Sequence, residues 1–473
     1  MDSSFRDPDG FVFLHHHRIL RCVHPRAAAD LLAFLSSPMA VARMADKVLP
    51  QTTLLAEPWG LDLPPELSRG IPEGAVMVEH EPIPVLNYPY EWSPRMLYAA
   101  AELTLQLAEA ASRAGFALKD ATPYNVMFHG SKPVFLDLLS FVRRDPLESV
   151  WRPYAQFVRT FVYPLLAARY FGLRPDEILL VHRDGLKPER IWRLCPAWRL
   201  LLPPFLGAVT LPKLLSREDR SADPAARFRV ARASDAGEAD FLLGRLFRRA
   251  NRLLRSAKIP ARESPATAYM EGGHSYSASQ FADKEHVLSE MFQRFQPRSV
   301  LDIGCNTGHF SLLAARHGAR VVALDHDPDA VDAVWTGARA QDLPVLPLVV
   351  DISRPPGACG WENRECASFL DRVRQNFDCV LMLALIHHLL VNERVPLDRI
   401  FDLLADLTTR LAVVEYVDPA DSQFQRIARG RDALHRDLTR DAFEAAARRR
   451  FDVLEKRDVT PTRSIYILQS VAA

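Results

Sequence analysis

From Val300 onward, short apolar runs alternate with segments that have the apolar spacing of amphipathic helices. The runs are SVLDI, RVVALD, LPLVVDI, DCVLMLAL and RLAVVEYV, with helical patterns between them. This alternation is typical of buried strands in a parallel sheet that is covered by helices. Two final apolar runs, 451–454 and 464–471, have only a short connection and favour a closing antiparallel pair. The sequence therefore predicts an α/β domain at the C-terminal end.

The chain has 473 residues and is too long for one compact domain. Residues 271–473 form the predicted α/β domain, and residues 1–213 read as an α+β domain with a helix over 96–114 and a strand pair after it. Between them, residues 214–270 read as an Arg-rich linker and an amphipathic helix. The Arg face could contact an anionic substrate or a membrane, but solvated or carboxylate-paired arginines are the more common case.

Composition excludes several function classes. The chain has 59 Lys and Arg against 58 Asp and Glu, a formal charge of +1, so no global field favours bulk nucleic-acid binding. The six cysteines form no C-x-x-C pair and the N-terminus lacks a signal-peptide pattern, which predicts a cytoplasmic protein. No stretch reaches the roughly 18 apolar residues of a membrane span. We expect no metal site, because adjacent histidines in the 15–17 run cannot converge on one strand face; the sequence does not indicate the oligomeric state.

The clearest chemical signal is the loop LDIGCNTGHF at residues 301–310, between the first strand and a helix. Glycines at such a turn allow a ligand to lie directly on the backbone. The loop lacks the third glycine of G-x-G-x-x-G, which argues against NAD or FAD. Asp302 fits poorly beside phosphates but could accept hydrogen bonds, through water, from an ammonium group. The loop therefore favours a zwitterionic ligand.

Carboxylates follow the next two strands. Asp325 ends the second strand, where it can accept two hydrogen bonds from a ribose diol. Asp351 ends the third strand, where it can accept a bond from an adenine amine while Ile352 packs on the ring. Each of these aspartates could instead cap the N-terminus of the helix that follows it. Together the positions describe an adenosine that carries an amino acid.

In order, LDIGCNTG, VVALDHD, VVDIS, LMLALIHHL and VVEYV resemble the class I S-adenosylmethionine (SAM)-dependent methyltransferases over about residues 271–473. The resemblance implies a seven-stranded Rossmann-like sheet with its last strand antiparallel, and SAM along the carboxyl ends of strands one to four. Asn306 replaces the middle glycine of the commonest loop. The expected cofactor-binding residues are Asp302, Gly304, Cys305, Asn306, Gly308, Asp325, His326, Asp351, Ile352 and Leu383.

Methyl transfer from a sulfonium mainly requires alignment of nucleophile, methyl carbon and sulfur. A hydroxyl acceptor also needs a base, and the candidates are His387 and His388 after strand four and Glu415 at the end of strand five. The alternative for the histidines is that one packs under the sheet edge and the other is solvated. Tyr276 and Lys284 precede strand one, where packing is the more common role.

The N-terminal region contains a second pattern. Asp120, Asn125 and Asp137 have the spacing of the catalytic and metal-binding loops of protein kinases and small-molecule phosphotransferases. That resemblance implies a kinase-like fold in which Asp120 orients an acceptor hydroxyl while Asn125 and Asp137 hold magnesium. However, no His-Arg precedes Asp120, and neither a Gly-rich loop nor a strand lysine is visible upstream. The alternative is a carboxylate network that holds a turn.

HEPIPVLNYPYEW, LKDATPYNVMF, PVFLDLLSF and WRPYAQF ahead of the methyltransferase motifs resemble bacterial two-part methyltransferases, including nodulation-associated ones. The expected function is methyl transfer from SAM to a small-molecule or glycan/lipid-type acceptor, with the N-terminal domain assisting acceptor recognition. Two alternatives stay open at this point. One is a bifunctional enzyme whose N-terminal domain also performs magnesium-nucleotide phosphotransfer, and the other is a non-catalytic SAM-binding scaffold.

Overall fold

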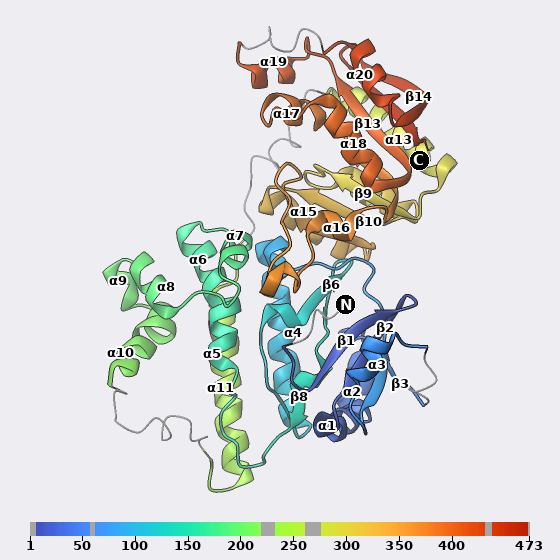
Figure 1. Cartoon of the computed structure of the whole chain (residues 1–473). Coiled ribbons are helices and arrows are strands. Elements are labelled where there is room, and N and C mark those ends of the chain that lie inside the picture. Colours follow the sequence, from blue (N-terminus) through green and yellow to red (C-terminus); the bar gives the residue numbers. More distant parts are fainter. Residues whose placement is uncertain (1–5, 57–61, 219–231, 261–275, 431–437, 472–473) are drawn as a thin grey trace. The chain divides into compact units, whose positions relative to one another are not determined.

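The computed structural model describes residues 6–56, 62–218, 232–260, 276–430 and 438–471 (Figure 1). The chain forms two compact units. Unit 1 comprises Met1–Phe128 and Lys132–Pro260, and unit 2 comprises His129–Ser131 and Ala261–Ala473. The three-part division at 213 and 270 stays a prediction, and residues 219–231 and 261–270 of its middle part lie outside the described residues.

Unit 2 is built on one seven-stranded sheet. Its strands are β9 (Ser299–Ile303), β10 (Arg320–Asp325), β11 (Val345–Val349), β12 (Phe377–Met382), β13 (Thr408–Val417), β14 (Phe451–Thr460) and β15 (Arg463–Ser470). Their order is β11-β10-β9-β12-β13-β15-β14. The neighbours from β11 to β13 are parallel, whereas β15 runs antiparallel to both β13 and β14. The predicted mixed sheet with an antiparallel last strand is confirmed.

Helices cover this sheet (Figure 1). They are α13 (Ala278–Phe295), α14 (His309–Arg316), α15 (Pro328–Ala340), α16 (Phe369–Val373), α17 (Ile386–Val391), α18 (Leu397–Leu407), α19 (Ser422–Ala428) and α20 (Arg440–Ala447). Helix α13 begins with a capping box, in which Ser277 Oγ accepts the Gln280 N–H and the Gln280 side chain accepts the Ser277 N–H. The core includes Val300, Val321, Leu381, Val413 and Ile467 from five different strands.

Unit 1 contains a four-stranded antiparallel sheet in the order β1-β2-β4-β3, made of Gly10–His15, Arg18–Val23, Val76–His80 and Thr52–Leu54. Helices α1 (Pro25–Leu35), α2 (Pro38–Ala45) and α3 (Pro65–Arg69) come from the same part of the chain. The long helix α4 (Pro94–Arg113) follows, then β5 (Phe116–Leu118), β6 (Val126–His129), β7 (Lys132–Phe135) and β8 (Phe141–Arg143). The predicted helix over 96–114 and the strand pair after it are confirmed, with ends shifted by a few residues.

The rest of unit 1 is helical: α5 (Tyr154–Phe157), α6 (Tyr163–Phe171), α7 (Pro175–Val181), α8 (Pro188–Leu194), α9 (Ala197–Leu200), α10 (Leu211–Glu218) and α11 (Ala236–Ser256). The Arg-rich helix α11 packs along α4. Its buried stripe includes Leu243 and Phe247, and the Phe247 ring lies 5.4 Å from that of Trp151. Among the described residues, no single helix has the length and apolar composition to cross a bilayer. Helices α1 and α2 reach that length and composition only when they are counted together, and they are bent by 71° at the break between them.

Candidate active site

The glycine loop connects β9 to α14. Gly304, Asn306 and Gly308 have φ values of 78°, 50° and 82°. A Cβ on Gly304 would lie 3.1 Å from Leu385 Cδ2, and a Cβ on Gly308 would lie 2.7 Å from Val334 Cγ2. Positive φ and the lack of room for a side chain both require glycine at residue 308. The loop therefore forms a tight turn that packs closely against Leu385 and Val334.

Asp325 lies beside this loop at the end of β10. Its Oδ2 accepts the Asn306 N–H at 2.9 Å, and its Oδ1 accepts the Asp327 N–H at 2.9 Å. Each carboxylate oxygen has a second lone pair, so two further hydrogen bonds can be accepted when the exposed His326 side chain turns away from Oδ1. That capacity matches the two hydroxyls of a ribose. His326 Nδ1 lies 3.2 Å from Oδ1, and this contact raises the pKa of His326.

Asp302 is buried on β9. Its Oδ2 accepts a hydrogen bond from Ser311 Oγ at 2.6 Å. Burial raises the pKa of Asp302 to about 6, although Ser311 and Lys284 act in the opposite direction. The side chain is therefore close to its titration point near neutral pH. A nearby cation would favour its ionised form.

Asp351 follows β11 and is half-buried. Its Oδ1 accepts the Ser353 N–H at 2.9 Å and the Ser353 hydroxyl at 2.6 Å, while Arg354 Nη1 lies 3.4 Å from Oδ2. Ile352 and Leu383 are buried, and burial raises the pKa of the Cys305 thiol well above its ordinary value. Because β11, β10, β9 and β12 are neighbours and parallel, the candidate cofactor residues gather at one edge of the sheet.

His387 belongs to the first turn of α17, directly after β12. Its side chain is only 3% exposed, and Nδ1 has no hydrogen-bond partner among the described residues. The ring lies 4.4 Å from that of His388 and 6.4 Å from that of Phe424. Burial, then the neighbouring His388, lowers the pKa of His387 to about 3, and burial also lowers the pKa of His388. Both imidazoles are neutral at physiological pH.

Glu415, the third candidate base, is fully buried on β13. Lys284 Nζ lies 2.5 Å from its Oε2, the Tyr276 hydroxyl donates to Oε1, and Arg463 Nη1 lies 3.6 Å from Oε1. Burial raises the pKa of Glu415, but Lys284 and Arg463 outweigh it and hold the pKa below its ordinary value. The carboxylate is ionised and already has three partners, which makes it a weak proton acceptor.

Two residues of this cluster were not anticipated from the sequence. Arg463 Nε and Nη2 each donate to Asp421 at 2.9 Å, and both residues are buried. Burial raises the pKa of Asp421, but the Arg463 hydrogen bonds outweigh it and bring it to about 2. A single arginine at the start of the apolar run 464–468 was the available signal, because a buried arginine needs a carboxylate partner.

In unit 1, the three kinase-like positions lie in one polar cluster. Asp137 accepts hydrogen bonds from Arg21 Nη1 at 2.8 Å and from the Ser140 hydroxyl, and Asn125 Nδ2 donates to Ser140 Oγ at 3.4 Å. Burial raises the pKa of Asp137, but Arg21 outweighs it and holds the pKa below its ordinary value. Burial, then the charge of Asp137, raises the pKa of Asp120. Among the described residues, no group of three or more His, Cys, Asp or Glu side chains is arranged to hold a metal ion.

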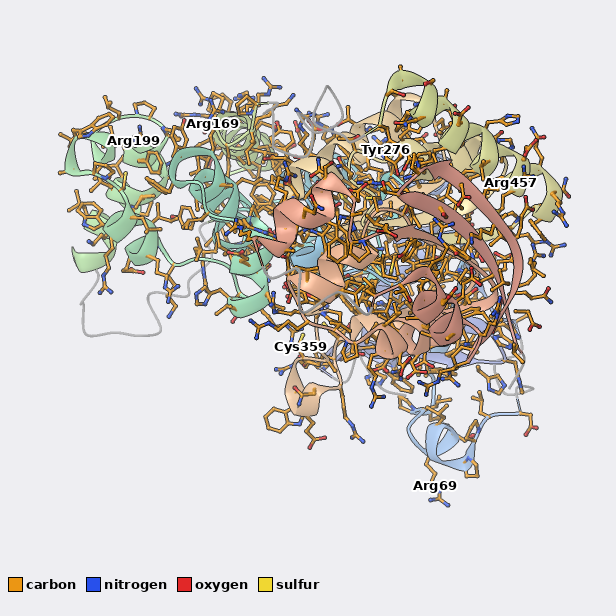
Figure 2. All side chains as sticks on the ribbon, turned by 90° about the horizontal axis from the view of Figure 1, so that it is seen from above. Arg69, Arg169, Arg199, Tyr276, Cys359 and Arg457 are labelled. Atoms are coloured by element: carbon orange, nitrogen blue, oxygen red, sulfur yellow. The ribbon has the colours of Figure 1, made fainter. Side chains whose placement is uncertain are left out.

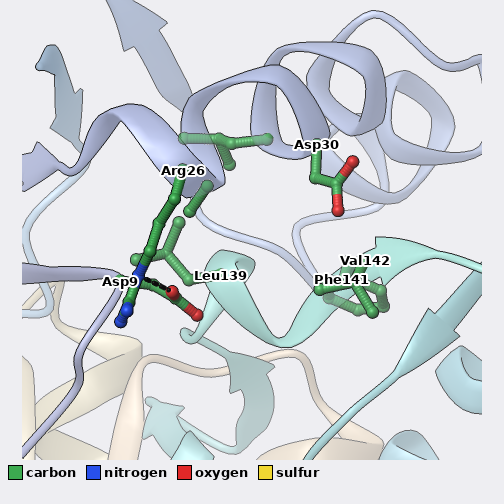
Figure 3. A pocket seen from close by; sticks show the side chains of 8 residues that line it. Asp9, Arg26, Asp30, Leu139, Phe141 and Val142 are labelled. Carbon is green, nitrogen blue, oxygen red and sulfur yellow. Dashed lines mark hydrogen bonds and ion pairs between the residues drawn. The ribbon is translucent and has the colours of Figure 1, made fainter. Parts of the chain in front are cut away.

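A cavity of about 440 Å³ adjoins this cluster (Figure 3). Its lining includes Asp9, Arg26, Asp30, Leu139 and Phe141. Asp9 Oδ1 lies 2.9 Å from Arg26 Nε, and Lys119 donates to the other oxygen of Asp9. The walls of the cavity therefore carry both charged and apolar side chains, a combination that is suited to binding a polar small molecule.

Comparison with known proteins identifies the chain. A family model described as a methyltransferase domain matches residues 276–453. Over 473 residues the chain is 30% identical to nodulation protein NoeA of Rhizobium meliloti (strain 1021), with 99% of this chain and 95% of NoeA covered. The chain belongs to the NoeA family. It is also 34% identical, over 114 residues and 35% of the relative, to ribosomal protein L11 methyltransferase of Herpetosiphon aurantiacus.

Two solved structures are similar to parts of this NoeA-family chain. WbdD, determined with the kinase inhibitor LY294002, is 19% identical over 42% of each chain, with a TM-score of 0.30. The match thus spans less than half of WbdD. The N-methyltransferase NodS from Bradyrhizobium japonicum WM9 is 12% identical over 41% of this chain and 99% of NodS, with a TM-score of 0.31. The family model and the sheet order make unit 2 a class I methyltransferase domain, whose methyl donor is SAM.

Proposed function

We propose that this enzyme transfers the methyl group of SAM to a hydroxyl of a small-molecule or glycan/lipid-type acceptor. The observation that supports this most is His387, a buried neutral imidazole whose Nδ1 has no partner among the described residues. It follows β12, and Leu385, two residues earlier in the chain, lies 3.1 Å from where a Cβ on Gly304 of the glycine loop would be. A neutral imidazole with an unpartnered nitrogen has the lone pair that can accept the proton a hydroxyl loses, although its lowered pKa makes His387 a weaker base than an ordinary histidine.

The cofactor residues would be those at the carboxyl ends of β9, β10 and β11. Asp325 would hold the ribose, Asp351 the adenine amine, and Asp302 the ammonium group through water. Gly304 and Gly308 allow the positive φ values of the loop and its close packing against Leu385 and Val334. Bound SAM supplies a methyl group already activated by the sulfonium, so the protein mainly has to align the acceptor.

The proton acceptor would be His387 or its neighbour His388. Glu415 is the least accessible of the three candidates, because it is fully buried and Lys284, Tyr276 and Arg463 already contact its oxygens. We propose instead that Glu415 anchors the start of α13 beside the site through Tyr276 and Lys284.

Replacement of the histidines tests this assignment. His387→Ala should retain SAM affinity while kcat falls at least about a hundredfold, since general-base catalysis contributes roughly 100-fold to 10,000-fold. His388→Ala is the matched variant, because it removes the adjacent imidazole and leaves His387 in place. Near-normal turnover in both single variants would contradict a histidine base and point to base-free transfer.

Unit 1 is proposed to assist acceptor recognition. Its support is the cavity lined by Asp9, Arg26 and Asp30 next to the Asp137 cluster. The kinase-like fold stays a prediction, and Arg21 on Asp137 opposes phosphotransfer because a cation already neutralises the expected magnesium ligand. No thermal stabilisation by ATP and magnesium, in wild type or Asp137→Ala, would leave the cluster a structural or acceptor-binding role.

The reaction is proposed to take place in the cytoplasm, because the six cysteines form no C-x-x-C pair in the sequence. The scaffold alternative differs from this proposal in one respect: a scaffold binds SAM without consuming it. Turnover of labelled SAM therefore separates the two.

A further inference from the structure

The helices α7 to α10 of unit 1 carry an unusual number of exposed apolar side chains. Val181 is 72% exposed, Leu201 68% and Trp198 59%, and Leu194, Leu202 and Leu211 are also exposed. We call these six residues, together with the exposed Lys187, Arg190 and Arg193, the apolar-basic surface. Figure 1 shows α8, α9 and α10 as a lobe (green), and Figure 2 shows Arg199 on it.

These exposed side chains are not needed to form the hydrophobic core of the lobe. The same short helices bury a second set of apolar residues, Leu179, Leu186, Ile191, Leu200 and Phe205. Helices α8 and α9 contact the π-helical segment Leu206–Thr210 behind them, which completes that interior. The lobe thus has its own core, and the apolar-basic surface is additional. Exposed apolar side chains that gather on one group of helices favour an interaction site.

Charge identifies the kind of partner. Residues 186–214 contain five Lys or Arg and a single acidic residue, Glu189, in a chain whose formal charge is only +1. A groove of about 410 Å³ between α7 and α8 is lined by Arg190, Arg193 and one acidic residue, Glu177, together with Val181 and Leu194. Two of the cations and two of the exposed apolar side chains of the apolar-basic surface therefore line the same groove.

We propose that the apolar-basic surface docks onto an anionic phospholipid membrane. Leucines and a tryptophan can enter the boundary between headgroups and acyl chains, while Lys and Arg contact lipid phosphates and rest their aliphatic stems on the apolar layer. A nucleic acid would not bury exposed leucines, and lysine is depleted at the centre of protein interfaces. This docking is independent of the methyl-transfer chemistry in unit 2.

Vesicle co-sedimentation of the full-length protein tests the proposal. Vesicles of phosphatidylglycerol and phosphatidylcholine in equal parts should bind the protein at least about tenfold better than phosphatidylcholine alone, and added salt should weaken binding. Lys187→Glu and Arg193→Glu should each weaken binding by at least about fivefold, the equivalent of one cation lost at an anionic surface.

Trp198→Ala and Leu201→Ser test the apolar contribution and should each weaken binding by at least about threefold. Trp361→Ala is the matched control, because Trp361 is 62% exposed but lies in unit 2, and it should bind like wild type. All these side chains are exposed, so the variants should fold; unchanged SAM binding and thermal unfolding would verify this.

Three results would overturn the proposal. The first is no preference for phosphatidylglycerol, and the second is an equal loss of binding in Trp361→Ala and Trp198→Ala. The third is a lipid-free protein whose self-association is abolished by Leu201→Ser while vesicle binding is unchanged, which would assign the surface to a second copy of the chain.

Discussion

Lys284 Nζ lies 2.5 Å from Oε2 of Glu415, and both side chains are almost completely buried. The pair joins the middle of α13 to the end of β13, across 131 residues of sequence. Tyr276 and Arg463 share the other oxygen of Glu415, so this carboxylate holds the entry of α13 against the sheet.

Lys284→Met should therefore lower the free energy of unfolding of unit 2 by about 3–5 kcal/mol, because the variant leaves Glu415 with less compensation for its buried charge. The midpoint of urea unfolding of the full chain measures the change. Arg374→Met is the control, since its contacts with Asp371 and Asp406 are long and exposed, and it should cost less than about 1 kcal/mol. Equal losses in the two variants would contradict a role for the buried pair.

Asp325→Ala should weaken binding of SAM and of its demethylated product by more than about tenfold, a loss of about 1.4 kcal/mol or more. The carboxylate is proposed to hold the ribose and also holds the Asn306 N–H of the loop. Calorimetry measures both affinities. Asp327→Ala removes a carboxylate two residues away that caps α15, and it should bind within about twofold of wild type. Equal binding by Asp325→Ala and wild type would remove the ribose assignment.

SAM affinity should rise with pH through about 6, because burial raises the pKa of Asp302 to about 6 in the free protein. Below that pH a proton has to leave before the carboxylate can face an ammonium group. Asp302→Asn should bind with no such pH dependence. Ser311→Ala, which removes the hydrogen bond that lowers this pKa, should move the midpoint upward. A flat wild-type profile from about pH 5 to 8 would refute the assignment.

The rate at saturating SAM should stay flat between about pH 5.5 and 8, because the pKa of His387 is lowered to about 3 and the base is already neutral. An imidazole with the ordinary pKa near 6.5 would instead lose activity between pH 7 and 6. A depressed histidine pKa also means that stability is fully present above pH 6.5 and declines as pH falls toward 3. A half-maximal rate near pH 6.5 would show that the base lies elsewhere.

The strands of unit 2 and its glycine loop could be predicted along the chain because each signal is local: apolar runs, a glycine loop and an aspartate at a strand end. The seven-stranded sheet itself was expected only from the resemblance to class I methyltransferases. The buried charge network could not, because Lys284, Glu415, Asp421 and Arg463 are far apart in sequence. Only the sheet order brings β13 and β15 together. The low pKa of His387 likewise depends on burial that no local pattern reports. In unit 1, the spacing of Asp120 and Asp137 was visible, but Arg21, the residue that neutralises Asp137, lies 116 residues away.

Transfer of label from methyl-labelled SAM tests the central claim most directly. The purified full chain is incubated with a cell extract, and the small-molecule, lipid and glycan fractions are separated. The account predicts label in one of these fractions with wild type, and label at least about tenfold lower with Asp325→Ala at SAM concentrations below saturation. Binding of SAM without label in any fraction would contradict it.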